Sequence, residues 1–241
     1  MKRLLDSKII SARVYLDFFP ASSEERVLNV CCGVGPQAVV YKNRFKEMIG
    51  VDVNSRRLEW SEKILPEYGV KNYRTICANV ENMPLPTASF DKALAIDIIE
   101  HVENPRVVLQ EIRRLLKSDG RLLITFPAMH DRYTDMANLI RKVFGRPLCL
   151  ANRSFNSWDP DSHNQDFPVK EWIRLVKSEG FLLFQSRATT MFPPLHFWGI
   201  PKFWFTNKLV NRIDGFFCKL PIIKNFGSAV MAVFVKNDRQ Y

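Results

Sequence analysis

The sequence predicts an α/β fold, in which a mostly parallel sheet is covered by helices on both faces. Short apolar runs typical of strands alternate with helical patterns through the first 126 residues. The chain has 241 residues, which is enough for one domain with a sizeable core and too few for two independent domains. We therefore predict a single domain over residues 1–241.

The elements are predicted in a regular order. The expected strands are residues 26–31, 48–52, 73–78, 90–96, 121–126, 181–186 and 228–235. The expected helices are residues 2–19, a helix starting at 36, and residues 54–66, 105–117 and 168–178. Prolines and glycines mark several of these boundaries. Pro20 ends the first helix, and Gly120 is expected to close the helix over 105–117.

Composition narrows the class of protein. Lys and Arg number 35 against 25 Asp and Glu, so the formal net charge is +10. The basic residues are spread along the chain instead of forming a stripe, so a nucleic-acid partner is not favoured. The five cysteines are scattered without a CxxC pair, which argues against a disulfide framework or a zinc site. No apolar stretch is long enough to span a bilayer, and we expect a cytoplasmic protein.

A glycine-rich turn follows the first predicted strand. Gly33-Val34-Gly35-Pro36 opens a helix, and Asp52 ends the next strand 17 residues after Gly35. This arrangement is typical of nucleoside binding, because backbone N–H groups of the turn face the ligand and the acid accepts from ribose hydroxyls. The turn also fits the GxGxxA form of a dinucleotide fingerprint. An NAD-binding oxidoreductase is therefore one alternative.

A wider set of motifs extends this pattern through residue 124. In order, they are Val27 to Gly35, Gly50 to Asn54, Ala78 to Pro84, Ser89 to Asp91, Glu100-His101-Val102, Leu109 to Lys117 and Gly120 to Ile124. Together they resemble the class I S-adenosylmethionine-dependent methyltransferases, most of all the small-molecule branch that includes quinone-ring methylating enzymes. The resemblance implies a Rossmann-like doubly wound sheet of seven strands, whose last strand, near 228–236, is antiparallel. It also implies S-adenosylmethionine as the cofactor.

The resemblance assigns cofactor-binding roles to individual positions. The residues that it places around the cofactor are Asn29, Cys31, Gly33, Gly35, Asp52, Val53, Asn79, Val80, Ile96 and Asp97. The two glycines correspond to the loop beneath the methionine part, and Asp52 corresponds to the ribose acid. Asn79 and Val80 correspond to the pair beside the adenine. Ile96 and Asp97 correspond to the end of the fourth strand, beside the methyl group.

Three of these positions depart from the family pattern. Asn29 and Asn79 stand where the family usually has acids, so each keeps hydrogen-bonding capacity and loses charge. Cys31 replaces the first glycine of the loop and adds a side chain where backbone and ligand usually approach closely. These departures leave open a second alternative, a non-catalytic protein that keeps the cofactor-binding fold.

Two histidines are candidates for the catalytic base. His101 follows the fourth predicted strand, and its alternative role is to cap the next helix. His130 lies just past the fifth predicted strand, and its alternative is an exposed loop residue. Residues 159–166 have metal-ligand side chains, but their spacing fits a solvated loop better. We therefore expect no metal site.

The remaining segments are predicted to cover the site. We expect residues 1–23 to form an N-terminal cap helix, 24–129 the cofactor-binding core, and 130–166 and 191–226 helical or aromatic substrate caps. Residues 191–226 contain nine aromatic residues and carry a net charge of +4. This composition suits a lid over an apolar acceptor or contact with a membrane surface, and equally a helix packed in the core. The favoured acceptor is a small, apolar or lipid-like molecule, with RNA less favoured. The oligomeric state is open.

Overall fold

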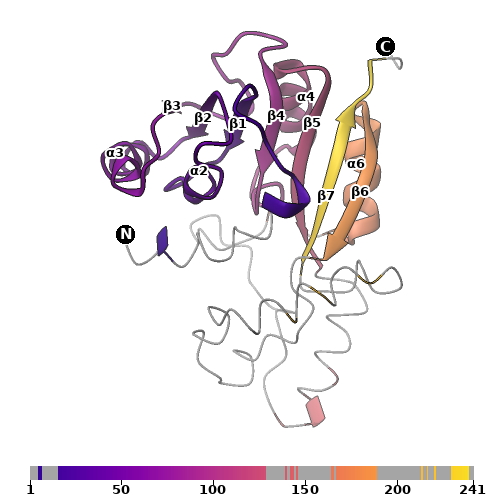
Figure 1. Ribbon diagram of the computed structural model, residues 1–241. Coiled ribbons are helices and arrows are strands. Elements are labelled where there is room, and N and C mark those ends of the chain that lie inside the picture. The colour runs from indigo at the N-terminus through magenta and orange to yellow at the C-terminus, as the bar shows by residue number, and fades with distance from the viewer. Residues whose placement is uncertain are drawn as a thin grey trace.

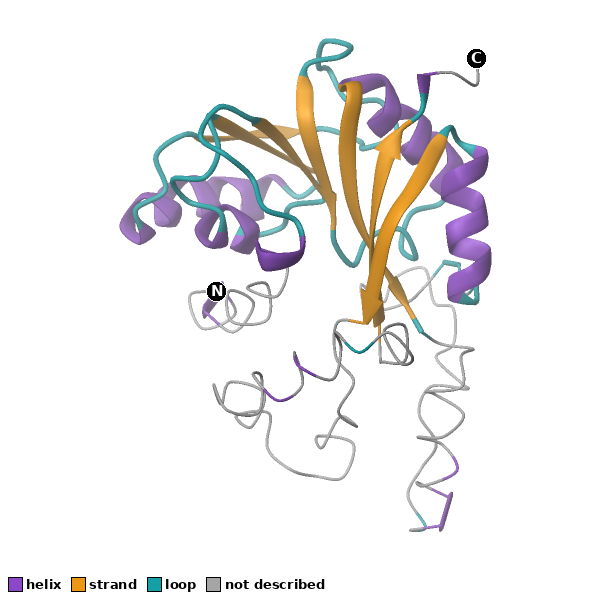
Figure 2. Cartoon of the chain, turned by 45° about the vertical axis from the view of Figure 1, so that its right-hand side comes forward, coloured by secondary structure: helices purple, strands orange, loops and turns teal. Residues whose placement is uncertain are grey.

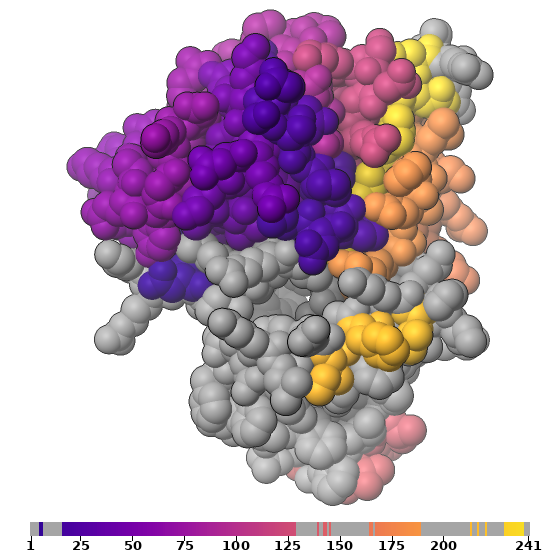
Figure 3. All heavy atoms as spheres, in the orientation of Figure 1, coloured from indigo at the N-terminus to yellow at the C-terminus, as the bar shows by residue number. Residues whose placement is uncertain are grey.

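The computed structural model describes the sheet, the helices around it and a few isolated positions. The described residues are 5–6, 16–128, 139, 142–143, 145, 164–165, 167–188, 213, 216, 220 and 229–238. Figure 1 follows the chain through these elements, and Figure 2 shows the twisted sheet with helices on its two sides. In the space-filling view, the first strands and the last two belong to one continuous body (Figure 3).

A single sheet contains seven strands in the order β3-β2-β1-β4-β5-β7-β6. The strands are β1 (Arg26–Val30), β2 (Glu47–Asp52), β3 (Tyr73–Cys77), β4 (Phe90–Ala95), β5 (Leu116–Pro127), β6 (Phe181–Ala188) and β7 (Ala229–Lys236). The strands β1 to β5 pair in parallel, whereas β7 lies antiparallel between β5 and β6. The prediction of seven strands with the last one antiparallel is confirmed.

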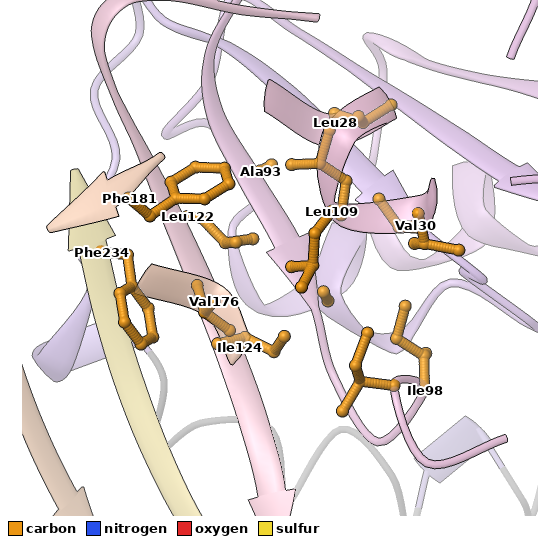
Figure 4. Packing of buried hydrophobic residues seen from close by; sticks show 14 of the residues in the cluster. Leu28, Val30, Ala93, Ile98, Leu109, Leu122, Ile124, Val176, Phe181 and Phe234 are labelled. Atoms are coloured by element: carbon orange, nitrogen blue, oxygen red, sulfur yellow. The ribbon is translucent and has the colours of Figure 1, made fainter. Parts of the chain in front are cut away.

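Helices cover both faces of this sheet. They are α2 (Pro36–Val40), α3 (Ser55–Ile64), the 3-10 helix η1 (Leu65–Tyr68), α4 (Pro105–Leu115) and α6 (Val169–Ser178). Leu109 of α4 and Val176 of α6 pack on one face of the sheet (Figure 4). Val39 of α2 and Leu65 of η1 belong to the core on the other face. The sheet is therefore doubly wound, as predicted.

The two core layers follow from the alternation of side chains along each strand. Leu122 and Leu123 are consecutive in β5 and both fully buried, yet they belong to the two opposite layers. A strand buried on both faces reads as a continuous apolar run instead of an alternating one. This is why residues 121–126 could be recognised as a strand from the sequence.

Asparagine side chains fix the start of two helices at the carboxyl edge of the sheet. Asn54 accepts a hydrogen bond from the Arg57 backbone N–H at the start of α3. Asn104 accepts one from Val107 N–H at the start of α4, where Pro105 occupies the first helical position. Both caps follow directly on segments that carry candidate site residues, so they hold those segments at the edge of the sheet.

The predicted boundary between α4 and β5 is wrong by several residues. The helix ends at Leu115, and β5 already begins at Leu116 instead of residue 121. Leu116 pairs with Phe90 of β4, so its backbone is extended and the helix cannot continue. The pairing then shifts before it resumes at Arg121. Gly120 lies within this irregular stretch of strand and does not close the helix.

Several predicted segments lie largely or wholly outside the described residues. These are the helix over 2–19, the caps over 130–166 and 191–226, and the loop at 159–166. The division of the chain into a core and caps therefore stays a prediction. None of the helices in the described part of the chain combines the length and the apolarity needed to cross a membrane.

Candidate cofactor and acceptor site

The candidate site residues meet at one edge of the sheet. The strands β1, β2 and β4 are neighbours and run parallel, so the residues that follow them lie side by side (Figure 1). They are the glycine loop after β1, Asp52 at the end of β2, and the segment from Ile96 to His101 after β4. In open parallel sheets this carboxyl edge is where ligands bind.

The glycine loop has an unusual backbone conformation. Cys31, Gly33 and Gly35 have φ angles of 48°, 54° and 72°, all in the left-handed region. A Cβ on Gly35 would lie 2.9 Å from Leu65 Cδ1, whereas a Cβ on Gly33 would meet no atom within 4 Å. The loop is therefore packed tightly at Gly35 and open at Gly33. Its open side leaves room for a ligand to approach the backbone.

Asp52 is hydrogen-bonded to the loop. Its Oδ2 accepts from Gly33 N–H at 2.8 Å, and its Oδ1 accepts from Asn54 N–H at 2.9 Å. The carboxylate is 6% exposed and thus connects the first loop to the end of β2. Each oxygen keeps a second lone pair for a ligand. Asp52 therefore shapes the loop as well as being available to bind ribose hydroxyls.

Beneath the loop, Tyr73 and Cys32 occupy the space next to Gly50. A Cβ on Gly50 would lie 2.7 Å from Cys32 Sγ, 2.8 Å from Tyr73 Cζ and closer still to Tyr73 Oη. Gly50 lies in the middle of β2, next to β1 and β3. A side chain at this position would thus push the tyrosine ring or the loop out of place.

We expect Gly50→Ala to lower the free energy of unfolding by about 1–3 kcal/mol, the usual cost of overpacking. A urea titration measures this change. The double mutant Gly50→Ala with Tyr73→Phe should recover part of the loss, because it removes the closest atom. Gly33→Ala is the matched control, since it adds the same methyl group to open space at the cost of backbone strain alone. No recovery in the double mutant would contradict the packing explanation.

The two loop cysteines are held as neutral thiols. Burial raises the pKa of Cys31 and of Cys32 to about 12, and the nearby Asp52 carboxylate adds to both shifts. The thiols consequently bring no negative charge to the loop at neutral pH. They are also poor nucleophiles, because thiolate is the reactive form.

The departures from the family pattern have structural partners. Asn29 is 1% exposed, and its Nδ2 donates to Gln37 Oε1 at 3.5 Å. Asn79 is exposed, and its Oδ1 accepts from Glu81 N–H at 2.9 Å. This oxygen already accepts one hydrogen bond, so its second lone pair and the amide N–H groups are left to bind the adenine ring. The backbone of Cys31 adopts a left-handed conformation, which ordinarily favours glycine.

At the end of β4, Thr125 fixes Asp97. The Thr125 hydroxyl accepts from Asp97 N–H at 2.7 Å and donates to Asp97 Oδ1 at 2.8 Å. Thr125 is fully buried in β5, and Asp97 has a positive φ of 53°. The pair of bonds holds the exposed carboxylate at the edge of the sheet, next to the partly buried Ile96. Sequence reasoning missed Thr125, because a threonine inside a strand carries no distinctive motif.

Glu100 is a buried carboxyl group in the same segment. The residue is 4% exposed, and its Oε2 is buried with no hydrogen-bond partner among the residues that the structure describes. Burial raises the pKa of Glu100 to about 8, and the charge of Asp97 adds to the shift. Glu100 Oε1 lies 3.9 Å from His101 Nε2. The sequence displayed Glu100 only as part of a family motif, and nothing in it indicated this burial.

The backbone of Glu100 and His101 is held by a segment distant in sequence. The Glu100 carbonyl accepts from Asn164 N–H at 2.7 Å and from Gln165 N–H at 3.1 Å. Asn164 Nδ2 also donates to the His101 carbonyl at 2.6 Å. Three hydrogen bonds therefore fix the turn that carries the buried carboxyl and the imidazole.

The structure places His101 at the predicted edge and excludes its alternative role. The cap of α4 is Asn104, so His101 does not cap that helix. Its side chain is 33% exposed. His130 lies outside the described residues, as does His163. Among the residues that the structure describes, no three His, Cys, Asp or Glu side chains gather closely enough to hold a metal ion.

A groove of about 520 Å³ lies next to this turn. It runs between the start of α4 and the length of α6, and its lining includes Asn104, Gln165 and Phe167. No predicted cofactor-binding residue lines it. The groove is therefore separate from the glycine loop.

The sheet order does not fit an NAD-binding domain. That fold has six parallel strands in the order 3-2-1-4-5-6. Here β7 is antiparallel and inserted between β5 and β6. The fold and the edge site together define an α/β domain of the methyltransferase type.

Comparisons with known proteins agree. A family described as "Methyltransferase domain" matches residues 28–124. An uncharacterised methyltransferase of Bacillus subtilis is 33% identical over 102 residues, which cover 42% of this chain and 40% of the relative. By sequence, the chain thus spans less than half of that relative's length. Residues 28–124 therefore match a methyltransferase-domain family, and the comparisons support the class I S-adenosylmethionine-dependent methyltransferases that the ordered motifs predicted.

One further relative and two solved structures extend the comparison. A demethylmenaquinone methyltransferase of a Geobacillus species is 24% identical over 184 residues, covering 69% of this chain and 74% of the relative. The crystal structure of the Bacillus subtilis protein covers 95% of this chain and 98% of its own, with a TM-score of 0.60 and 20% identity. The structure of a geranyl diphosphate C-methyltransferase of Streptomyces coelicolor matches 93% of this chain and 74% of its own chain, with a TM-score of 0.60 and 13% identity. These structures share the fold.

Proposed function

We propose that this protein transfers a methyl group from S-adenosylmethionine to a small, apolar or lipid-like acceptor. The observation that carries the proposal is the bridge between Asp52 and the open glycine loop, at the carboxyl edge of a sheet of methyltransferase order. The hydrogen bond from Gly33 N–H to Asp52 holds two groups next to each other. The acid is suited to bind ribose hydroxyls, and the loop backbone is suited to bind the polar tail of the ligand.

The residues present fit the cofactor. Gly33 leaves an open approach to the loop backbone, where the methionine part would lie. Asp52 would accept from the ribose hydroxyls through the lone pairs that remain. Val53 is 69% exposed immediately after this acid, and with Asn79 and the buried Val80 it would bind the adenine. Ile96 and Asp97 would lie beside the methyl group.

The methyl donor supplies an electrophilic carbon, so the chain has little covalent chemistry to perform. Its residues mainly bind the two reactants and hold them in line, which is catalysis by proximity. A hydroxyl or an acidic carbon must also lose a proton during transfer. His101 lies at the right edge to take part in that step, and His130 is a second candidate in the undescribed part of the chain.

The acceptor class is supported by composition and by relatives. Aromatic residues concentrate in residues 191–226, a composition suited to an apolar lid or to a lipid surface. Two of the similar proteins are named for demethylmenaquinone and geranyl diphosphate. We propose that 130–166 and 191–226 form the acceptor pocket, and that 191–226 provides any contact with a membrane surface.

The test follows the methyl group. The purified protein is incubated with S-adenosylmethionine labelled in its methyl group and with lipid extract, quinols or small amines in parallel. We expect label in an apolar product that depends on the protein. Binding of the methyl donor with no labelled product from any of these sources would favour the non-catalytic alternative.

Cys31→Gly tests whether the departure from the family glycine weakens the site. The left-handed conformation at residue 31 costs residues other than glycine roughly 1–2 kcal/mol, so glycine removes this strain. Glycine also makes the unfolded chain more flexible, which lowers the free energy of unfolding and offsets part of the gain. The free energy of unfolding should therefore change by less than about 1 kcal/mol. Affinity for S-adenosylhomocysteine should rise severalfold, as measured by calorimetry. Weaker binding in Cys31→Gly would show that the cysteine side chain contacts the ligand favourably.

A further inference from the structure

Glu100 combines three features that a purely structural side chain does not need. It is a carboxyl group buried almost completely, one of its oxygens has no partner in the described part of the chain, and it lies in the turn that follows β4. Leaving a buried polar atom unpaired costs about 1–3 kcal/mol. An apolar residue of similar size would avoid that cost, so an unpaired carboxyl oxygen here indicates a partner that is not part of the described chain.

The location of the turn suggests that this partner is the acceptor. Asp97, three residues earlier, is fixed by Thr125 at the place assigned to the methyl end of the cofactor. The turn itself is fixed by the hydrogen bonds from Asn164 and Gln165. Glu100 is therefore held rigidly next to the reacting end of the proposed site.

We propose that Glu100 is a catalytic residue, whose carboxylate takes the proton that the acceptor loses when it is methylated. The inference rests on the proposed function. An electron pair of the acceptor atom forms the bond to the methyl carbon, and the carbon–sulfur bond breaks with its electron pair going to sulfur. The proton passes from the acceptor to Glu100 Oε2. It then leaves through His101, which is partly exposed, to water.

The electrostatic surroundings suit this role. Within the described ranges, the charged or titratable side chains that lie against Glu100 are those of Asp97 and His101. Burial and the charge of Asp97 raise the pKa of Glu100 to about 8, which makes its carboxylate a stronger base than an ordinary glutamate. The 3.9 Å from Glu100 Oε1 to His101 Nε2 is longer than a hydrogen bond. Such contacts commonly tighten when substrates bind.

A test that needs no acceptor compares two cofactor ligands. S-adenosylmethionine has a positively charged sulfonium, whereas S-adenosylhomocysteine has a neutral thioether and no methyl group. If Glu100 ionises next to the methyl group, the preference for the charged ligand must grow as the pH rises through 8. Calorimetry at pH 6.5, 7.5 and 9 measures both dissociation constants for the wild type, Glu100→Gln and Glu103→Gln. Glu103 is an exposed glutamate three residues away and is the matched control.

In the wild type and in Glu103→Gln, we expect the preference for S-adenosylmethionine to increase about fivefold between pH 6.5 and 9. Glu100→Gln should show no such increase beyond what the ligands' own ionisation causes. The same increase in Glu100→Gln as in the wild type would overturn the proposal, and so would a constant preference in the wild type. A constant preference in the wild type overturns it even if Glu100→Gln fails to fold. Failure of both ligands to bind at any pH would contradict the proposed function itself.

Discussion

Asp52→Ala is expected to weaken binding of S-adenosylhomocysteine by about 1.5–3 kcal/mol, the range for hydrogen bonds to a charged group. The same substitution should lower the free energy of unfolding by about 1–2 kcal/mol, because it leaves Gly33 N–H and Asn54 N–H without their acceptor. Sequence alone suggested an effect on the ligand only. The structure adds the second effect, since the carboxylate also holds the loop.

Calorimetry and urea titration measure the two changes separately. Asp52→Asn keeps one carbonyl acceptor and loses the charge, so both of its effects should be intermediate. Glu59→Ala removes an acid from the exposed face of α3 and is the control for net charge. Unchanged affinity in Asp52→Ala would disprove the ribose assignment. Unchanged stability would show that the loop does not depend on the bridge.

Glu100→Gln is expected to make the protein more resistant to unfolding at alkaline pH. The pKa of Glu100 lies at about 8 in the folded protein, against an ordinary 4.5. The folded state therefore keeps a proton that the unfolded state loses between these values. This contribution to stability is complete below pH 4.5 and is lost as the pH rises to 8. The loss amounts to about 1.4 kcal/mol per pH unit. Glutamine has no such dependence.

Urea titrations at pH 5.5, 6.5 and 7.5 measure the effect. Relative to Glu100→Gln, the free energy of unfolding of the wild type should fall by roughly 3 kcal/mol over this range. The value is that of about 1.4 kcal/mol per pH unit taken over two pH units. Glu103→Gln should follow the wild type, because Glu103 is exposed. Parallel curves for the wild type and Glu100→Gln would mean that Glu100 ionises normally in the folded state.

Most of the fold could be predicted because its signals are local. The strands β1 and β2 and the second half of β5 contain short apolar runs, and each boundary residue such as Asn104 or Pro105 acts on its own turn. The start of β5 could not be predicted, because it depends on the pairing of Leu116 with Phe90, which are distant in sequence. The antiparallel direction of β7 was predicted from the family resemblance alone, and its position between β5 and β6 was not predicted.

The residues of the candidate site also fall into those that the sequence revealed and those that only the structure revealed. Asp52 and the glycines were recognisable because their spacing reflects one helix and one strand. Tyr73, Thr125 and Glu100 were not recognisable as site residues, because their roles depend on burial and on contacts between strands. Glu100 in particular looks like any charged residue in the sequence, and only its burial in the fold makes it a candidate base.

The central claim is that the edge site beside Asp52 binds S-adenosylmethionine, and calorimetry tests it most directly. The wild-type protein is titrated with S-adenosylmethionine, S-adenosylhomocysteine and NAD under the same conditions. The structure predicts saturable binding of the first two at one site, weakened in Asp52→Ala, and no binding of NAD. Binding of NAD alone, or binding of S-adenosylmethionine that Asp52→Ala leaves unchanged, would contradict it.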